Sequence, residues 1–395
     1  MISHNSLVAA VLDRPPGLAR RTVLALSLVI AGASLISCRS EPGSGTFYTT
    51  TKSADQANVA WSVSTADTMP FGYVAHIAVA QGRVFVLDQL LNSVTVLDTA
   101  GKFLASFGRK GFGPGEFNYV QKIAVSGDTV FVKDDRLHLF GFDGKVLATA
   151  PNPSFRYFDG MVATPYGLVF QHAEYDSPFG APARKRTTQF SLYDLVSKSF
   201  CDKVSVVDTV YGIGESSYIP TPYGIRTPFT WSAQGDLIRT VGDSFHIIVQ
   251  SLSGDTVRHN AFATGRVEVS ELDRADFIDR AAKSFERPRR DIKRAVEQIG
   301  VERHFHPVVG ALVSGADNSL MILRSDLTER PYRPRLGAPA EVDIWVVVDS
   351  TYSEIARMQL PHSFRPMHLD KNAIYGVLTR EDDTTEVVRY NLPRR

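Results

Sequence analysis

A segment of the chain repeats itself 46 residues further on. Residues 77–79 (IAV) recur as 123–125, and residues 84–88 (VFVLD) recur as 130–134 (VFVKD). In each copy a short polar turn separates two apolar runs, which is typical of two antiparallel strands. A period in the forties that is built from short strands indicates a propeller, whose blades are four-stranded sheets. The repeat therefore predicts an all-β fold.

Weaker copies of the pattern continue along the chain and together predict six blades. Their inner strands begin near residues 77, 123, 161, 229, 308 and 366. The sixth copy ends one strand short, whereas residues 57–65 (ANVAWSVST) resemble a strand that belongs to no copy. Pairing of 57–65 with 387–390 would close the ring and satisfy the backbone groups of two sheet edges. We therefore expect a six-bladed β-propeller over residues 56–395, in which blade three is the least clearly delimited by the sequence.

Residues 107–117 (FGRKGFGPGEF), which precede the second copy, carry a resemblance to a known family. With the strands on either side, and with 92–94 (NSV) in the place of an Asn-His-Leu triplet, the stretch 76–145 resembles the NHL repeats of six-bladed propellers. Val120 and Lys122 stand where that family usually has Pro and Gly. The resemblance implies the propeller fold. Because such propellers include binding modules, lyases and lactonases, it implies no single chemistry.

The N-terminal segment has the features of an export signal. Arginines precede an apolar run at 23–36 that is too short to span a bilayer. The run ends in LISC at 35–38, which resembles the lipobox of bacterial lipoproteins. We expect residues 1–37 to be a lipoprotein signal peptide and Cys38 to carry acyl chains that anchor the protein stably. A plain signal peptide, a buried strand and a twin-arginine signal at 20–21 are the alternatives.

Residues 38–55 would connect the lipid to the propeller. They are rich in Ser, Gly and Thr, and we expect a flexible tether. The protein would then be exported and lipid-anchored to the bacterial cell envelope, on its periplasmic or cell-surface side, with the membrane as one partner. The net charge of +1 argues against a nucleic-acid partner, because binding to phosphates requires a basic surplus.

Residues 270–300 break the strand pattern and predict a helical hairpin inserted between blades four and five. Ser270 and Asp273 resemble a capping box, and Pro288 separates two runs of apolar residues at helical spacing. The apolar positions are Leu272, Ala275, Ile278, Ala282 and Phe285, followed by Ile292, Ala295, Val296 and Ile299. Two interpretations stay open: a hairpin that packs its apolar stripe on the propeller, and a lid or docking element.

The insertion and the longest loops are expected on one face of the propeller. Links from an outer to the next inner strand, and from a second to a third strand, lie on the same side, so 172–188 and 324–341 would join the insertion around one mouth. Such loops often carry function. Their arginines favour a small anionic ligand or an acidic partner protein, because arginine binds carboxylates and phosphates bidentately. The candidate ligand-binding residues are Asp88, Arg109, Lys110, Asp134, Arg289, Arg290, Arg294 and Arg333.

The acidic and histidine candidates also have structural explanations. An Asp that follows a strand, such as Asp88 or Asp134, commonly accepts hydrogen bonds from the N–H groups of the turn. His304 and His306 would lie on one side of an extended segment, and His362 comes in the next equivalent link. Zinc needs three or four ligands, and no third ligand lies near the pair in sequence, so we expect no metal site. The sequence contains no nucleophile, phosphate-loop, dinucleotide or metalloprotease motif, and we predict no catalytic residue and no cofactor.

The leading hypothesis is therefore a lipid-anchored propeller that acts as a ligand-binding or protein-interaction module. The alternative is a propeller enzyme of the lactonase or lyase type, which would use a divalent cation at the channel mouth. The two cysteines imply no disulfide framework, and we expect Cys201 to be a small buried residue in a blade strand.

Overall fold

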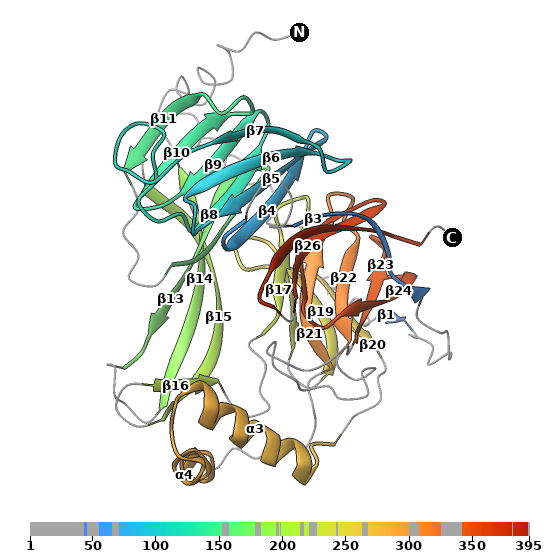
Figure 1. Cartoon of the computed structure of the whole chain (residues 1–395). Coiled ribbons are helices and arrows are strands. Elements are labelled where there is room, and N and C mark those ends of the chain that lie inside the picture. The colour runs from blue at the N-terminus through green and yellow to red at the C-terminus, as the bar shows by residue number, and fades with distance from the viewer. Residues whose placement is uncertain are drawn as a thin grey trace, which may run out of the picture.

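Six mainly antiparallel sheets surround a common axis, and two helices lie beside the far end of the third sheet (Figure 1). The computed structural model describes residues 43–45, 55–64, 71–151, 158–177, 183–194, 197, 199–213, 217–220, 227–241, 244–262, 268–299, 308–324, 342–380 and 382–393. Each sheet runs from an inner strand beside the axis to an outer strand at the rim. The expectation of a six-bladed β-propeller is confirmed.

The first three blades follow one another along the chain, inner strand first. Blade one consists of β4 (Val74–Ala80), β5 (Arg83–Asp88), β6 (Ser93–Asp98) and β7 (Phe103–Phe107), and blade two of β8 (Lys122–Ser126), β9 (Thr129–Lys133), β10 (Arg136–Gly141) and β11 (Val146–Pro151). Blade three consists of β12 (Phe158–Thr164), β13 (Gly167–Tyr175), β14 (Ala183–Asp194), β15 (Ser199–Ile213) and β16 (Ser217–Pro220). Blades one and two thus coincide with the two copies of the sequence repeat.

The last three blades each receive a strand from the N-terminal part of the chain. Blade four consists of β17 (Phe229–Trp231), β18 (Leu237–Val241), β19 (Ser244–Gln250), β20 (Thr256–Phe262) and β1 (Gly43–Gly45). Blade five consists of β21 (Val309–Ser314), β22 (Leu320–Arg324), β23 (Val342–Val348), β24 (Glu354–Pro361) and β2 (Asp55–Gln56). Blade six consists of β25 (Phe364–Asp370), β26 (Ala373–Thr379), β27 (Thr385–Asn391) and β3 (Asn58–Ser64).

The ring is closed by strand exchange between the two ends of the propeller. β3 pairs antiparallel with β27, with Val59 opposite Tyr390 and Val63 opposite Val387. Val63 is buried in the cluster between blades six and one, whereas Val59 is exposed. The closing strand and its partner are those expected from the sequence. The pairing satisfies backbone groups that would otherwise form two open sheet edges.

The two shorter N-terminal strands run along the outer edges of blades four and five. β1 pairs in parallel with β20, and β2 pairs in parallel with β24. Parts of the segment expected to be a tether, 38–55, therefore lie against the propeller. Cys38 and the predicted signal peptide lie outside the described residues.

The core is divided into clusters that each lie between two neighbouring blades. Between blades one and two, Phe85 packs in one cluster with Ile123, and both side chains are fully buried. Between blades three and four, the ring of Phe190 lies 4.8 Å from that of Phe229 and 5.4 Å from that of Trp231, centroid to centroid. Burial of each such side chain contributes roughly 1.5–3 kcal/mol. Side-chain packing between the blades therefore reinforces the closure by β3.

A Gly-rich turn leads from blade one into blade two. The N–H of Gly111 donates to the carbonyl of Phe117 (2.9 Å), and the N–H of Phe117 donates to the carbonyl of Arg109 (2.8 Å). Gly108 has a φ of +83°, and a Cβ there would lie 2.1 Å from the fully buried ring of Phe117. Any other residue at this position would strain the backbone and displace that ring.

The insertion between blades four and five is a helical hairpin, as predicted. It consists of α3 (Glu271–Ser284) and α4 (Arg289–Ile299), and the capping box of Ser270 and Asp273 is present. The helices bury Phe277, Ile278, Ala281 and Ile292 largely against one another. Leu272, which was expected in the apolar stripe, is 76% exposed, and Phe277 and Ala281 complete the stripe instead. No described helix is long and apolar enough to cross a membrane.

Blade three reaches beyond the others toward the helical hairpin. β13, β14 and β15 are 9, 12 and 15 residues long, and their extended ends lie beside α3 and α4 (Figure 1). α4 contacts β15. The hairpin therefore packs at the end of blade three, on the face where the inner strands begin.

Candidate ligand site in the central channel

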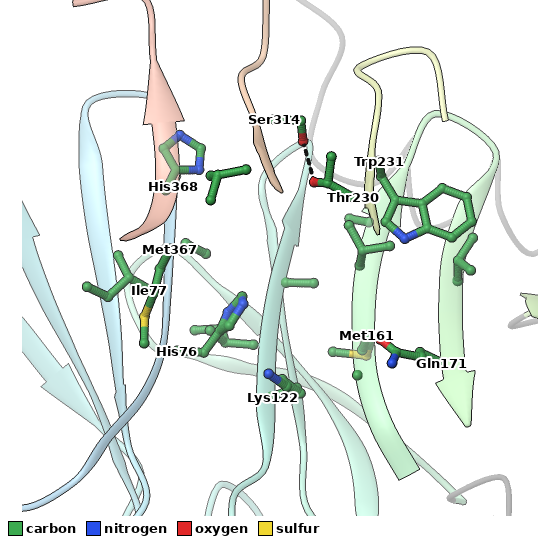
Figure 2. A pocket seen from close by; sticks show the side chains of 18 of the residues that line it. His76, Ile77, Lys122, Met161, Gln171, Thr230, Trp231, Ser314, Met367 and His368 are labelled. Carbon is green, nitrogen blue, oxygen red and sulfur yellow. Dashed lines mark hydrogen bonds between the residues drawn. The ribbon is translucent and has the colours of Figure 1, made fainter. Parts of the chain in front are cut away.

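The inner strands of the six blades line a cavity of about 630 Å³ along the axis (Figure 2). These strands are β4, β8, β12, β17, β21 and β25. A cavity of this volume lies within the range of small-molecule sites, which combine apolar walls with a few polar groups. The charged groups of this cavity gather at the end where the inner strands begin.

Two cations lie at this end. Lys122 is the first residue of β8, and Arg365 is the second residue of β25. The guanidinium of Arg365 donates to the carbonyl of Val74 (2.6 Å) and lies 5.9 Å from the centroid of the Tyr73 ring. Among the described residues, the amine of Lys122 forms no hydrogen bond or ion pair, and Arg365 forms no ion pair. Neither positive charge is therefore neutralised by a direct carboxylate contact within that part of the chain.

The nearby carboxylate is already paired. Asp159, the second residue of β12, forms an ion pair with the buried Arg186 of β14. Arg186 also donates to the hydroxyl of Thr188 (2.7 Å). Lys122, Arg365 and Arg186 thus share one described carboxylate, which leaves a surplus of two positive charges. Burial lowers the pKa of Lys122, the charge of Arg365 lowers it further, and Asp159 acts in the opposite direction.

Two histidines line the cavity in the neutral state. Burial lowers the pKa of His76 on β4 to about 3, and the charges of Lys122, Arg365 and His368 contribute to this shift. Burial also lowers the pKa of His368 on β25 to about 4, although Asp370 opposes the change. His76 and Lys122 both point into the channel (Figure 2). Each neutral imidazole can donate or accept a hydrogen bond there without adding a positive charge.

The middle of the cavity is apolar, and its far end carries two hydroxyl groups. Met161 and Met367 lie on opposite sides of the channel (Figure 2). At the far end the hydroxyls of Thr230 and Ser314 are hydrogen-bonded at 3.0 Å, and Trp231 lies beside them. The channel therefore has a basic end, an apolar middle and a neutral polar end.

Asp88, a candidate ligand-binding residue in the sequence, is committed to the turns beside its strand. Its carboxylate is fully buried and accepts hydrogen bonds from the N–H groups of Gly72 (2.6 Å), Tyr73 (3.2 Å) and Leu91 (2.9 Å). It does not line the cavity. Asp88 therefore has the structural role that is common for an Asp after a strand: its carboxylate accepts hydrogen bonds from the adjacent turns.

Asp134 occupies the equivalent position in blade two. It is 1% exposed and accepts hydrogen bonds from the N–H groups of Asn118 (3.0 Å) and Arg136 (2.6 Å), and it lies 2.9 Å from Nε2 of the buried His138. Burial raises the pKa of Asp134, but the hydrogen bonds from His138 and the two backbone N–H groups outweigh it and bring the pKa below its usual value. This carboxylate, too, lies away from the cavity lining.

Arg109 and Lys110 lie in the Gly-rich turn at the rim. The side chain of Arg109 is 80% exposed and forms an ion pair with Glu116 (2.7 Å), whose carboxylate also accepts from the N–H of Gly113 (2.9 Å). Lys110 forms a backbone bridge with Phe117 and is exposed. Neither cation lines the cavity. The Arg109–Glu116 pair closes the turn on itself.

The remaining candidates belong to the insertion and to a loop outside the described residues. Arg289 pairs with Asp279 of α3, Arg290 is 83% exposed in its side chain, and Arg294 is also exposed. None of the three lines the cavity. Arg333 lies outside the described residues. The described candidates from the sequence are therefore distributed over turns, the rim and the insertion rather than gathered at one site.

Of the histidines considered as metal ligands, His362 alone lies within the described residues. His304 and His306 lie outside the described residues, and Nδ1 of His362 lies 2.9 Å from Asp343. Within the described ranges, no three His, Cys, Asp or Glu side chains come together as ligands for a metal ion.

The channel residues His76, Lys122 and Arg365 were not among the candidates from the sequence, although the repeat contains a signal for His76 and Lys122. His76 and Lys122 are equivalent positions of the 46-residue repeat, and equivalent positions of neighbouring inner strands lie side by side around the axis. Lys122 is also where the chain departs from the Gly that NHL repeats usually have. Arg365 belongs to a blade whose sequence similarity to the repeat is too weak to show this alignment.

With this geometry described, the class of the protein is that of six-bladed β-propellers. Residues 51–179 match a protein family, DUF5128, described as a 6-bladed beta-propeller. The matched stretch contains β2, β3, blades one and two and the first two strands of blade three, up to the middle of the link that follows. No curated protein matches the sequence.

Several solved structures resemble the chain at low identity. A Bacteroides fragilis protein classed provisionally as exported is 13% identical, with 83% of this chain and 92% of that chain covered and a TM-score of 0.47. A DUF4221 family member from Bacteroides vulgatus is 9% identical, with 87% and 98% covered and a TM-score of 0.48. A virginiamycin B lyase from Staphylococcus aureus, solved with quinupristin, is 12% identical, with 80% and 94% covered and a TM-score of 0.37.

Proposed function

We propose that this chain is an exported, lipid-anchored propeller that binds a small anionic ligand at the basic end of its central channel. The observation that carries the proposal is the pair Lys122 and Arg365, two cations that line one cavity without a carboxylate partner among the described residues. Asp159, the carboxylate beside them in the described part of the chain, is paired with Arg186. The site therefore offers positive charge that the described fold does not use.

An unpaired cation in a partly buried position is unfavourable for the fold. Removal of charge from water costs free energy unless a hydrogen-bonded partner compensates for it. The lowered pKa of Lys122 reflects this cost. A bound anion would favour the charged form and raise the pKa again. The concave, weakly polar wall would also strengthen the attraction, because it focuses the field of the two cations.

Saturation-transfer NMR with acetate as the probe tests this proposal. We expect a saturation signal on the acetate methyl group with the native chain and its loss in Lys122→Met, which keeps the length of the side chain and removes the charge. Lys371→Met is the matched control, because Lys371 is exposed in the turn between β25 and β26 and should leave the signal unchanged. An equal signal from native chain and Lys122→Met would contradict binding at the channel cations.

The anchoring part of the proposal rests on the sequence of the N-terminal segment. The apolar run at 23–36 and the LISC motif at 35–38 support lipidation of Cys38. Metabolic labelling with a fatty-acid analogue tests it. The label should be incorporated by the native chain and by Cys201→Ser, the other cysteine, and it should be absent from Cys38→Ser. Label on Cys38→Ser would contradict the lipid anchor.

A further inference from the structure

The apolar middle of the channel has no function if the ligand is a bare anion. Met161 and Met367 line the cavity from different blades, beyond the basic end, and Met161 is largely buried between blades two and three. The exposed part of Met367 is available for contact, because this side chain is only partly buried. Methionine is flexible and polarizable, and it adapts to apolar groups of varied shape. The ligand that fits such a channel has an apolar part as well as a charge.

We infer that the ligand is an amphiphilic monocarboxylate, whose carboxylate lies between Lys122 and Arg365 and whose apolar body extends along the channel between Met161 and Met367. This inference rests on the proposed function, and it adds the chemical class of the ligand. The carboxylate would enter from the face where the inner strands begin. The neutral imidazole of His76 lies near Lys122 in the channel (Figure 2).

The two cations suit a carboxylate. Arg365 already donates one hydrogen bond to Val74, which leaves part of its guanidinium and the whole amine of Lys122 for the ligand. Asp159 is paired with Arg186, so the ligand faces Lys122 and Arg365. A carboxylate has two oxygens, one for each of these cations, and hydrogen bonds between such charged groups are stronger than neutral ones.

The dimensions favour an extended body. β4 has seven residues, and at roughly 3.3 Å per residue an inner strand of this length spans roughly 23 Å. The cavity of about 630 Å³ follows these strands. Each methylene group that leaves water improves the dissociation constant about fourfold, which corresponds to ~0.8 kcal/mol. The apolar wall should therefore increase affinity with chain length.

Isothermal titration of the full folded chain with three probes tests the inference. Decanoate has both parts, acetate has the charge alone, and decanol has the apolar body alone. We expect decanoate to bind at least 100-fold more tightly than either of the other two. Lys122→Met should reduce decanoate affinity at least tenfold, whereas Lys371→Met should leave it unchanged.

Substitutions of Met367 separate the apolar contact from the charge. Met367→Gln should weaken decanoate about tenfold and leave acetate unchanged, and Met367→Leu should restore decanoate binding because it keeps an apolar side chain. If acetate requires Lys122 but decanoate binds no more tightly than acetate, the amphiphilic ligand is wrong and the anion site stands. If neither probe depends on Lys122, the proposed function is wrong as well. Equal affinity for decanol and decanoate would also overturn the inference.

Discussion

The strand-end turns and the channel use charge in opposite ways. In the turns, Asp88 and Asp134 are buried and each accepts hydrogen bonds from surrounding groups. In the channel, Lys122 and Arg365 are half-buried and have no carboxylate partner among the described residues. A charge whose hydrogen-bonding capacity is filled by the protein stabilises the fold. A charge that the protein leaves uncompensated is available to a ligand.

The contrast separates repeated residues with a structural role from residues that are candidates for function. Asp88 and Asp134 occupy equivalent positions because the same turn follows the same strand in two blades. His76 and Lys122 also occupy equivalent positions, but they differ in kind, since the turn does not constrain them. In this propeller, the repeated Asp has a structural role, whereas the charged group of the channel stands where the two copies differ.

The largest expected effect concerns the buried turn carboxylate. Asp88→Ala leaves the N–H groups of Gly72, Tyr73 and Leu91 without their acceptor, and each lost bond costs about 1–3 kcal/mol if the group stays buried. We expect the free energy of unfolding to fall by about 3 kcal/mol or more in urea denaturation. Asp98→Ala, which removes an acceptor from an exposed turn, is the control and should cost about 1 kcal/mol. Equal losses in both variants would show that the buried turn carboxylate stabilises the fold no more than an exposed one, which would contradict the contrast.

The histidines of the channel should make stability depend on pH. In the unfolded chain they titrate near pH 6.5, whereas in the native state the pKa is about 3 for His76 and about 4 for His368. Between these values the unfolded state binds more protons, so stability falls as pH falls from 6.5 toward 4, by at most ~1.4 kcal/mol per pH unit for each histidine.

Urea denaturation at pH 7 and pH 5 measures this dependence. His76→Asn cannot titrate, and the difference in unfolding free energy between the two pH values should be smaller in this variant than in the native chain. His259→Asn, in the outer strand of blade four, is the control and should retain the native dependence. If His76→Asn kept the full pH dependence of the unfolding free energy, His76 would not be held neutral in the folded channel, and the prediction would be wrong.

A smaller and opposite effect is expected at the channel lysine. Lys122→Met removes a partly buried cation that has no direct partner in the described part of the chain, so the free energy of unfolding should stay within about 1 kcal/mol of the native value or rise. Thermal and urea denaturation measure it, with Lys371→Met as the exposed control. If the free energy of unfolding fell by several kcal/mol, the amine of Lys122 would stabilise the fold. Lys122 would then not differ from the turn carboxylates.

The smallest effect is expected at the helical insertion. Arg290 and Arg294 are exposed on α4, and neutral glutamines there should leave both stability and acetate binding unchanged. The acetate saturation signal of the Arg290→Gln, Arg294→Gln double variant measures this. Loss of the signal would place the anion site on the insertion, as the sequence suggested, and not in the channel.

The sequence predicted the fold far better than the site. The 46-residue spacing and the unpaired strand at 57–65 are local patterns, and they were sufficient for six blades and for the pairing of β3 with β27. The channel was not predictable in the same way, because Lys122 and Arg365 are far apart in sequence and meet only when the ring closes. Conversely, Asp88 was a ligand-binding candidate by its position, yet its carboxylate accepts hydrogen bonds from Gly72 and Tyr73 of the preceding link, which the position alone did not show.

The most direct test of the contrast between turns and channel measures the melting temperature at rising acetate concentration and constant ionic strength. The native chain is compared with Asp88→Ala and Lys122→Met. A ligand that binds only the native state raises the melting temperature by mass action. We predict that Asp88→Ala melts lower but shows the native acetate shift, and that Lys122→Met melts near the native temperature without any shift. A full acetate shift in Lys122→Met, or its loss in folded Asp88→Ala, would contradict the account.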